Sequence, residues 1–196
     1  MTRTHAWAAA ALWACGVAWL PTAAAFDFSG DKALVARFRD GGQLPLGRVF
    51  FTPAPTPTPG REPQAATFKV LLDTTALTDH FLSMREFKCL PGGTEITCVV
   101  PYPYAHPGTA APGQLAWLEH NLLFLFKQPA DFGAKLWNGV IFKFTETPTA
   151  LVGRPQAVDL NAVSAPPERL DEPPYTDMDR TDFPAGARWV TELRIE

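Results

Sequence analysis

Residues that mark the common catalytic and metal-binding motifs are scarce in this sequence. Its 196 residues include three cysteines and four histidines, and none of them forms a CxxC, HxH or HxxxH pattern. No serine stands in the GxSxG turn of a nucleophile elbow. These absences argue against a cysteine or histidine metal site, and against a serine-hydrolase site, that is encoded in one local stretch. Sites of these two kinds would have to be assembled by folding from distant residues.

Basic clusters are missing as well. The chain carries 17 lysines and arginines against 20 aspartates and glutamates, without a basic run or a glycine-aromatic RNA-binding motif. We therefore expect no nucleic-acid partner, and no motif points to a cofactor.

Beyond the N-terminal region the sequence has no segment that is long and apolar enough to span a membrane. No transmembrane anchor is expected once the leader has been removed.

The N-terminal residues have the layout of a secretory signal peptide. One basic residue precedes an apolar run over residues 6–20, and a proline ends that run. Three consecutive alanines ending at Ala25 then offer the small side chains that a signal peptidase reads. We expect cleavage after Ala25, which gives a signal peptide of residues 1–25 and a single β-rich exported domain of residues 26–196.

The predicted compartment is a bacterial periplasm or the secreted space. A composition rich in alanine, proline and arginine, together with a short leader, is typical of bacterial exported proteins. The run Leu-Trp-Ala-Cys-Gly that contains Cys15 loosely resembles a lipoprotein box, so a lipoprotein anchored through Cys15 is the alternative. Cleavage after Ala25 would instead leave two cysteines, an even count that suits an oxidising compartment.

Two short runs in the middle of the chain predict a β-hairpin. Residues 84–90 and 96–100 are rich in apolar and β-branched side chains, and Pro-Gly-Gly-Thr turn chemistry separates them. With a four-residue loop, Cys89 lies directly opposite Cys98. Opposed residues of a non-hydrogen-bonded pair come close enough to bridge, so the sequence predicts a Cys89–Cys98 disulfide.

Short apolar or alternating runs, broken by glycine and proline, recur along the chain. Residues 135–145 alternate with large apolar side chains on both faces, which predicts a strand buried on two sides. This organisation favours a mainly β, single-domain fold, either an antiparallel sandwich or a small barrel with one or two short helices. The other expected strands cover residues 33–39, 48–51, 66–73, 150–153, 156–160 and 188–195.

The best helix candidate lies within residues 109–128. Pro112 is compatible with a first helical turn, and Pro129 would end the helix. Residues 117–126 place apolar side chains all round the cylinder, which indicates a helix that is buried or that presses on a partner. Residues 122–126 could alternatively form a buried strand.

Aromatic residues are the main candidates for a binding site. All fourteen phenylalanines lie after residue 25, and several stand with two tryptophans in the most apolar stretches. They could form an apolar cavity for a lipid-like ligand, or they could fill the core. Two tyrosines in a proline-rich loop could bind a partner at little entropic cost, or pack back over the sheet. The candidate ligand-binding residues are Trp117, Phe124, Phe126, Trp137, Phe142, Phe144, Tyr102 and Tyr104.

Candidate metal ligands are scattered along the chain. The three histidines after the leader, with one methionine, would make a nitrogen–sulfur set suited to copper if folding brought them together. An acidic loop offers oxygen ligands for calcium, although its spacing misses the EF-hand pattern. Alternatively, the histidines are ordinary surface residues and the acidic loop is solvated. The metal candidates are His80, Met84, His106, His120, Asp177, Asp179 and Asp182.

Catalysis has only one weak local candidate. Asp79 and His80 could serve an extracytoplasmic hydrolase, but adjacency in sequence is not triad geometry. We therefore expect an exported, non-enzymatic protein that binds a protein partner or a small apolar ligand. The alternatives are a hydrolase-type enzyme that uses Asp79 and His80, and a periplasmic copper or calcium binding protein.

Overall fold

A computed structural model describes residues 25–54, 65–81, 84–90, 92, 94–131, 133, 135–163 and 165–196. Residues 1–24 of the expected signal peptide lie outside these ranges, and the lipid-attachment candidate Cys15 is among them. The side chain of Met84 is not described either. Within the described ranges, no helix has the length and apolar character that crossing a membrane requires.

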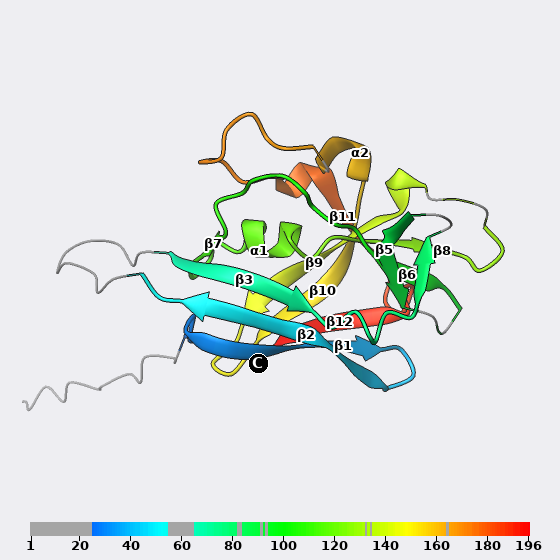
Figure 1. Cartoon of the computed structure of the whole chain (residues 1–196), viewed down its shortest axis with the longest axis horizontal. Coiled ribbons are helices and arrows are strands. Elements are labelled where there is room, and N and C mark those ends of the chain that lie inside the picture. Colours follow the sequence, from blue (N-terminus) through cyan, green and yellow to red (C-terminus); the bar gives the residue numbers. More distant parts are fainter. Residues whose placement is uncertain are drawn as a thin grey trace, which may run out of the picture.

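The described residues form one antiparallel sheet of twelve strands with two short α-helices (Figure 1). The strand order is β4-β5-β6-β8-β9-β10-β12-β1-β2-β3-β7, and β11 pairs with β10 beside this path. The expectation of a mainly β, antiparallel fold with one or two short helices is confirmed. The elements are β1 (Gly30–Phe38), β2 (Gln43–Thr52), β3 (Ala66–Leu72), β4 (Asp79–Phe81), β5 (Met84–Leu90), β6 (Ile96–Val99), β7 (Thr109–Ala110), α1 (Ala116–His120), β8 (Phe124–Lys127), the 3₁₀ turn η1 (Leu136–Asn138), β9 (Gly139–Glu146), β10 (Leu151–Val158), α2 (Leu160–Val163), the 3₁₀ turn η2 (Asp177–Asp179), β11 (Arg180–Asp182) and β12 (Val190–Ile195).

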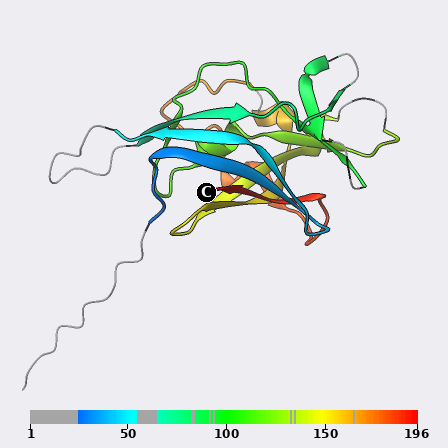
Figure 2. The same ribbon diagram turned by 60° about the horizontal axis from the view of Figure 1, so that its bottom comes forward.

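The sheet curls on itself without closing (Figure 2). Strands β1 and β2 stand several positions away from β9 in the strand order, yet their side chains share one hydrophobic core. Leu34 of β1, Val49 of β2 and Phe142 of β9 all belong to this core and are fully buried. Neighbouring strands are about 4.8 Å apart, so a flat sheet would keep these side chains from meeting.

Strand β9 is buried on both faces, as its alternation predicts. Phe142 and Phe144 belong to the main core, whereas Ile141 belongs to a second cluster on the opposite face. Leu160 of α2 contributes to this second cluster. Large apolar residues at successive positions are what a strand buried on two sides requires. The exceptions are Lys143, which is only partly buried, and the last two residues of the strand, Thr145 and Glu146.

The predicted hairpin and its bridge are confirmed. In the ladder between β5 and β6, Cys89 pairs with Cys98 and Leu90 pairs with Thr97. The two cysteines form a disulfide and are buried in the second cluster. The bridge therefore sits at one of the two ladder pairs that these strands share.

The helix expected within residues 109–128 is found only over Ala116–His120, and the rest of this prediction is wrong. This stretch forms β7, the five-residue helix α1 and β8 instead. Leu122 and Phe124 belong to the main core, while Leu123 and Leu125 belong to the second cluster. Apolar side chains at every position thus serve a segment that lies between two clusters. The alternative of a buried strand over residues 122–126 is close to the observed β8.

Two short strands that the sequence suggests over residues 150–153 and 156–160 are one strand, β10. Along one edge β10 has two neighbours, since residues 151–153 pair with β12 and residues 156–158 pair with β11. Pro155 lies in the gap between these two ladders. Proline has no N–H to donate, and neither β11 nor β12 forms a ladder pair with this residue.

Candidate functional site

A surface cleft of about 630 Å³ lies between the segment that leads from β7 into α1 and the loop that precedes β11. Pockets of roughly 300–1,000 Å³ are typical of small-molecule sites. The two walls come from segments far apart in the sequence, around residues 107–117 and 170–177, and β9 contributes to the cleft between them.

Both walls of the cleft carry apolar side chains next to polar and charged ones. Ala110, Ala111 and Ala116 line one wall, and their short side chains leave space beside Trp117. Leu170 lines the other wall and is 45 % exposed. A large apolar side chain that faces solvent inside a concave surface is typical of a site that takes an apolar ligand.

The cleft also contains one lysine, Lys143 of β9. Its ammonium lies 3.5 Å from Oε2 of Glu119, a fully buried residue of α1. The backbone N–H of Phe144 donates to Oε1 of the same carboxylate at 2.8 Å. Strand β8 pairs with β9 at Gly139 and Val140 and does not reach this part of the strand, so Glu119 occupies the position that β8 leaves.

The electrostatics of Glu119 are a balance between burial and its donors. Burial raises the pKa of the Glu119 carboxyl, while the N–H of Phe144 and the charges of Lys143 and Arg180 oppose that rise. A carboxyl with a raised pKa in a cleft would be a candidate acid or base. Glu119 is fully buried, however, and does not line the cleft. Its geometry suits the positioning of Lys143 better than proton transfer to a ligand.

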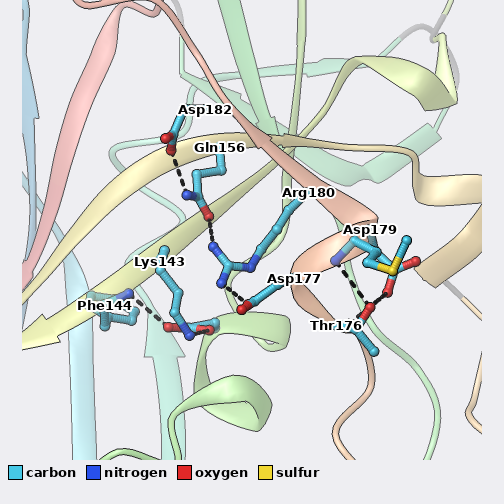
Figure 3. Close-up of polar contacts among 10 residues, drawn as sticks. Lys143, Phe144, Gln156, Thr176, Asp177, Asp179, Arg180 and Asp182 are labelled. Carbon is cyan, nitrogen blue, oxygen red and sulfur yellow. Dashed lines mark hydrogen bonds and ion pairs between the residues drawn. The ribbon is translucent and has the colours of Figure 1, made fainter.

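Arg180 of β11 ties the loop wall to the sheet (Figure 3). One guanidinium nitrogen donates to Gln156 of β10, and another donates to Asp177 of η2. The amide of Gln156 in turn donates to Asp182 at 2.6 Å. This chain of contacts holds the loop wall against the same sheet that carries Lys143.

A capping box closes the turn at the tip of this wall (Figure 3). The carboxylate of Asp179 accepts the backbone N–H of Thr176 at 2.7 Å and its hydroxyl at 2.8 Å. These bonds lower the pKa of the Asp179 carboxyl. The hydroxyl of Thr176 accepts the N–H of Met178, whose side chain is 95 % exposed.

The acidic residues considered for calcium are therefore engaged in different contacts. Asp177 binds Arg180, Asp179 caps η2, and Asp182 accepts from Gln156. Across the described part of the chain, no three side chains of histidine, cysteine, aspartate or glutamate come together as a metal-binding group.

Five candidate rings come together behind the cleft. The ring of Tyr102 lies 4.4 Å from that of His120 and 5.4 Å from that of Tyr104, between centroids. His106 stacks on Trp117 at 6.2 Å. Trp117 belongs both to this cluster and to the cleft. The cluster packs the aromatic loop before β7 onto α1.

The protonation state of His120 follows from its contacts. Its Nε2 lies 2.8 Å from the carbonyl oxygen of Val163, so this nitrogen carries the proton and donates. Burial lowers the pKa of the fully buried His120 ring, and the nearby His106 lowers it further. Its Nδ1 is then an acceptor, and it has no hydrogen-bond partner among the described residues.

The Asp79–His80 pair does not have dyad geometry. Both residues lie in β4, where successive side chains point to opposite faces of the sheet. The Asp79 carboxylate accepts the backbone N–H of His80 at 2.7 Å. A catalytic dyad needs the carboxylate on the imidazole. His80 is also separate from the cluster that holds His106 and His120.

The phenylalanine candidates lie in or beside the core. Phe124, Phe142 and Phe144 are buried members of the main core. Phe126 packs against this core, and the guanidinium of Arg188 lies 3.6 Å from its ring centroid. Trp137 of η1 is 64 % exposed and does not line the cleft. Among the aromatic candidates, Trp117 is the one that lines it.

Three residues of the site escaped the sequence analysis. Lys143 carried a usable signal, because a single charge inside a strand that is apolar on both faces needs a reason. Glu119 and Leu170 carried none, since their roles depend on which segments fold against β9 and α1.

Comparison of the chain with protein-family models, with curated proteins and with solved structures gives no match. The function is therefore inferred from the chemistry of the cleft.

Proposed function

We propose that this protein is an exported, non-enzymatic binding protein, and that it holds a small apolar ligand in the cleft between the β7–α1 segment and the loop before β11. The observation that carries this proposal is the 630 Å³ concave surface in which Trp117 and the half-exposed Leu170 line facing segments. Burial of apolar surface is the main source of affinity in such sites.

Two further observations support the cleft over the interior of the domain. Phe124, Phe142 and Phe144 pack in the main core, where they act as filling and not as a lining. The small residues Ala110 and Ala111 sit at the cleft, where they leave room for an occupant. The export part of the proposal is supported by the leader-like N-terminus and by a disulfide, which persists in oxidising compartments.

The first test is purification from the native compartment, followed by solvent extraction and mass spectrometry. We expect a small apolar compound to copurify with the protein. The emptied protein should then bind 1-decanol in isothermal titration calorimetry. Substitution Leu170→Asp places a charge on the apolar wall and should abolish both results.

Leu136→Asp is the matched control, because Leu136 is also a leucine with a similar exposure, 40 %, and it lies outside the cleft. This variant should retain the extracted compound and the binding of decanol. Protein that carries no extractable compound and fails to bind decanol would contradict the proposal. A copurifying protein in place of a small molecule would contradict the small-ligand part of the proposal.

A further inference from the structure

The cleft contains the ammonium group of Lys143, which has more N–H donors than its contact with Glu119 uses. We infer that the ligand carries a carboxylate head group which Lys143 binds, so that the cleft takes an alkyl or aryl carboxylate in preference to a neutral or cationic amphiphile. This inference rests on the proposed function and names the class of its ligand.

The first argument is the environment of Lys143. The ammonium has three N–H donors. Among the described residues, Glu119 is the one acidic partner within ion-pair distance, and at 3.5 Å its oxygen is at the limit of a hydrogen bond. The Lys143 side chain is 39 % exposed and lines the cleft. Donors that Glu119 does not use are therefore available to a ligand.

The second argument is that Glu119 is a weak competitor for this ammonium. Its other oxygen already accepts the N–H of Phe144 at 2.8 Å, and its charge is shared with Arg180. Burial disfavours the charged form of the carboxyl. A ligand carboxylate in the open cleft would keep part of its hydration and could offer the lysine shorter, charge-assisted bonds.

The third argument is that the acidic rim is occupied. Asp171 and Glu172 both contact Arg169, at 3.4 and 2.5 Å, and Asp177 contacts Arg180. The three carboxylates are each more than half exposed, so water and salt screen the charge that the two arginines leave over. We therefore expect the acidic rim to attract a cationic head group more weakly than Lys143 attracts an anionic head group.

The contribution of the head group can be tested by calorimetry with three probes that share one alkyl chain. They are decanoate and decyltrimethylammonium, each used below its micelle-forming concentration, and 1-decanol, used below its solubility limit. The unsubstituted protein should bind decanoate about tenfold more tightly than decanol, and decyltrimethylammonium most weakly.

Three variants then identify the residue that reads the head group. Lys143→Met should lower the affinity for decanoate about tenfold and leave that for decanol unchanged. Lys143→Arg should retain the preference for the acid. The matched control Lys135→Met removes a similarly exposed lysine that pairs with Asp131, outside the cleft, and should behave as the unsubstituted protein.

Glu119→Gln is the decisive variant, because it should increase affinity. The glutamine Oε1 can still accept the N–H of Phe144, but Lys143 loses its competing anion. We expect decanoate to bind about threefold more tightly, whereas a purely structural role for the pair predicts no gain or a loss. This variant also keeps the test decisive if Lys143→Met fails to fold.

The outcomes separate the two proposals. If decanol and decanoate both fail to bind, the cleft is not an apolar-ligand site and the proposed function falls together with this inference. If decanol binds but decanoate binds no more tightly, or Glu119→Gln brings no gain, the proposed function stands and the carboxylate inference is overturned.

Discussion

The most stringent test of the fold concerns a buried ion pair that joins the hairpin loop to the segment just before the C-terminal strand β12. Glu95 follows β5 in the hairpin loop and is 4 % exposed. Its Oε1 accepts the backbone N–H of Trp189 at 2.8 Å, and its Oε2 lies 3.2 Å from Nη1 of Arg188. The Arg188 side chain is itself 14 % exposed, and burial lowers the pKa of its guanidinium. We predict that Glu95→Ala destabilises the domain severely.

The magnitude follows from what Glu95→Ala leaves behind. Removal of one partner of a buried ion pair costs about 3–5 kcal/mol, because the other charge stays buried without a counter-charge. The Arg188–Glu95 contact is an ion pair without good hydrogen-bond geometry, which favours the lower end of this range. The N–H of Trp189 also loses its acceptor, at a cost of about 1 kcal/mol that partly overlaps with the first. We expect a total loss of about 3–4 kcal/mol.

Urea denaturation with the disulfide intact measures this loss as a shift of the midpoint at constant m value. Glu95→Gln keeps an acceptor for Trp189 and should cost less than Glu95→Ala. The control is Asp31→Ala, which breaks the exposed pair between Asp31 and Arg48 and should cost much less than Glu95→Ala, because water screens this pair. A loss below 1 kcal/mol for Glu95→Ala, or equal losses for Glu95→Ala and Asp31→Ala, would refute the reasoning.

Three further predictions concern single features of the fold. Replacement of Cys89 and Cys98 by alanine should lower the free energy of unfolding by about 2.5–3 kcal/mol in urea titrations, with unchanged secondary structure by circular dichroism. The pKa of His120 is lowered in the folded state, so stability should be full above pH 6.5 and should fall as the pH drops below it, by at most about 1.4 kcal/mol per pH unit for this group. The variant His120→Gln should flatten this dependence in denaturation series at several pH values, and His80→Gln should not. Gly47 has a φ of +145°, and a Cβ there would overlap a backbone carbonyl of β3, so Gly47→Ala should lower thermal stability by about 2 kcal/mol or more.

The parts of the fold that could be predicted are those that a local period determines. The two-residue alternation of β9 and the turn between β5 and β6 fix side-chain directions within a few residues, which is why the Cys89–Cys98 register was predictable. The helix prediction within residues 109–128 failed for the opposite reason. Apolar side chains at every position carry no period, and only the two clusters on either side of β8 decide for a strand.

The cleft could not be predicted from the sequence, because its walls come from distant segments that only folding brings together. Glu119 finds Lys143 because α1 packs beside a stretch of β9 that β8 does not cover. Leu170 reaches the cleft because Arg180 anchors the following turn to β10. The ring cluster could be predicted in part, since Tyr102, Tyr104 and His106 share one loop. The packing of this loop against α1 could not be predicted from the sequence.

The proline in the gap of β10 has a consequence for how wide the cleft can open. β11 pairs with residues 156–158 of β10, directly after Pro155, and its Arg180 contacts both Gln156 and the loop wall. A shift of β11 by one pair toward the β12 end of β10 would bring a ladder step to Pro155, which has no N–H to donate. The proline therefore disfavours movement of the loop wall in that direction, although it does not line the cleft.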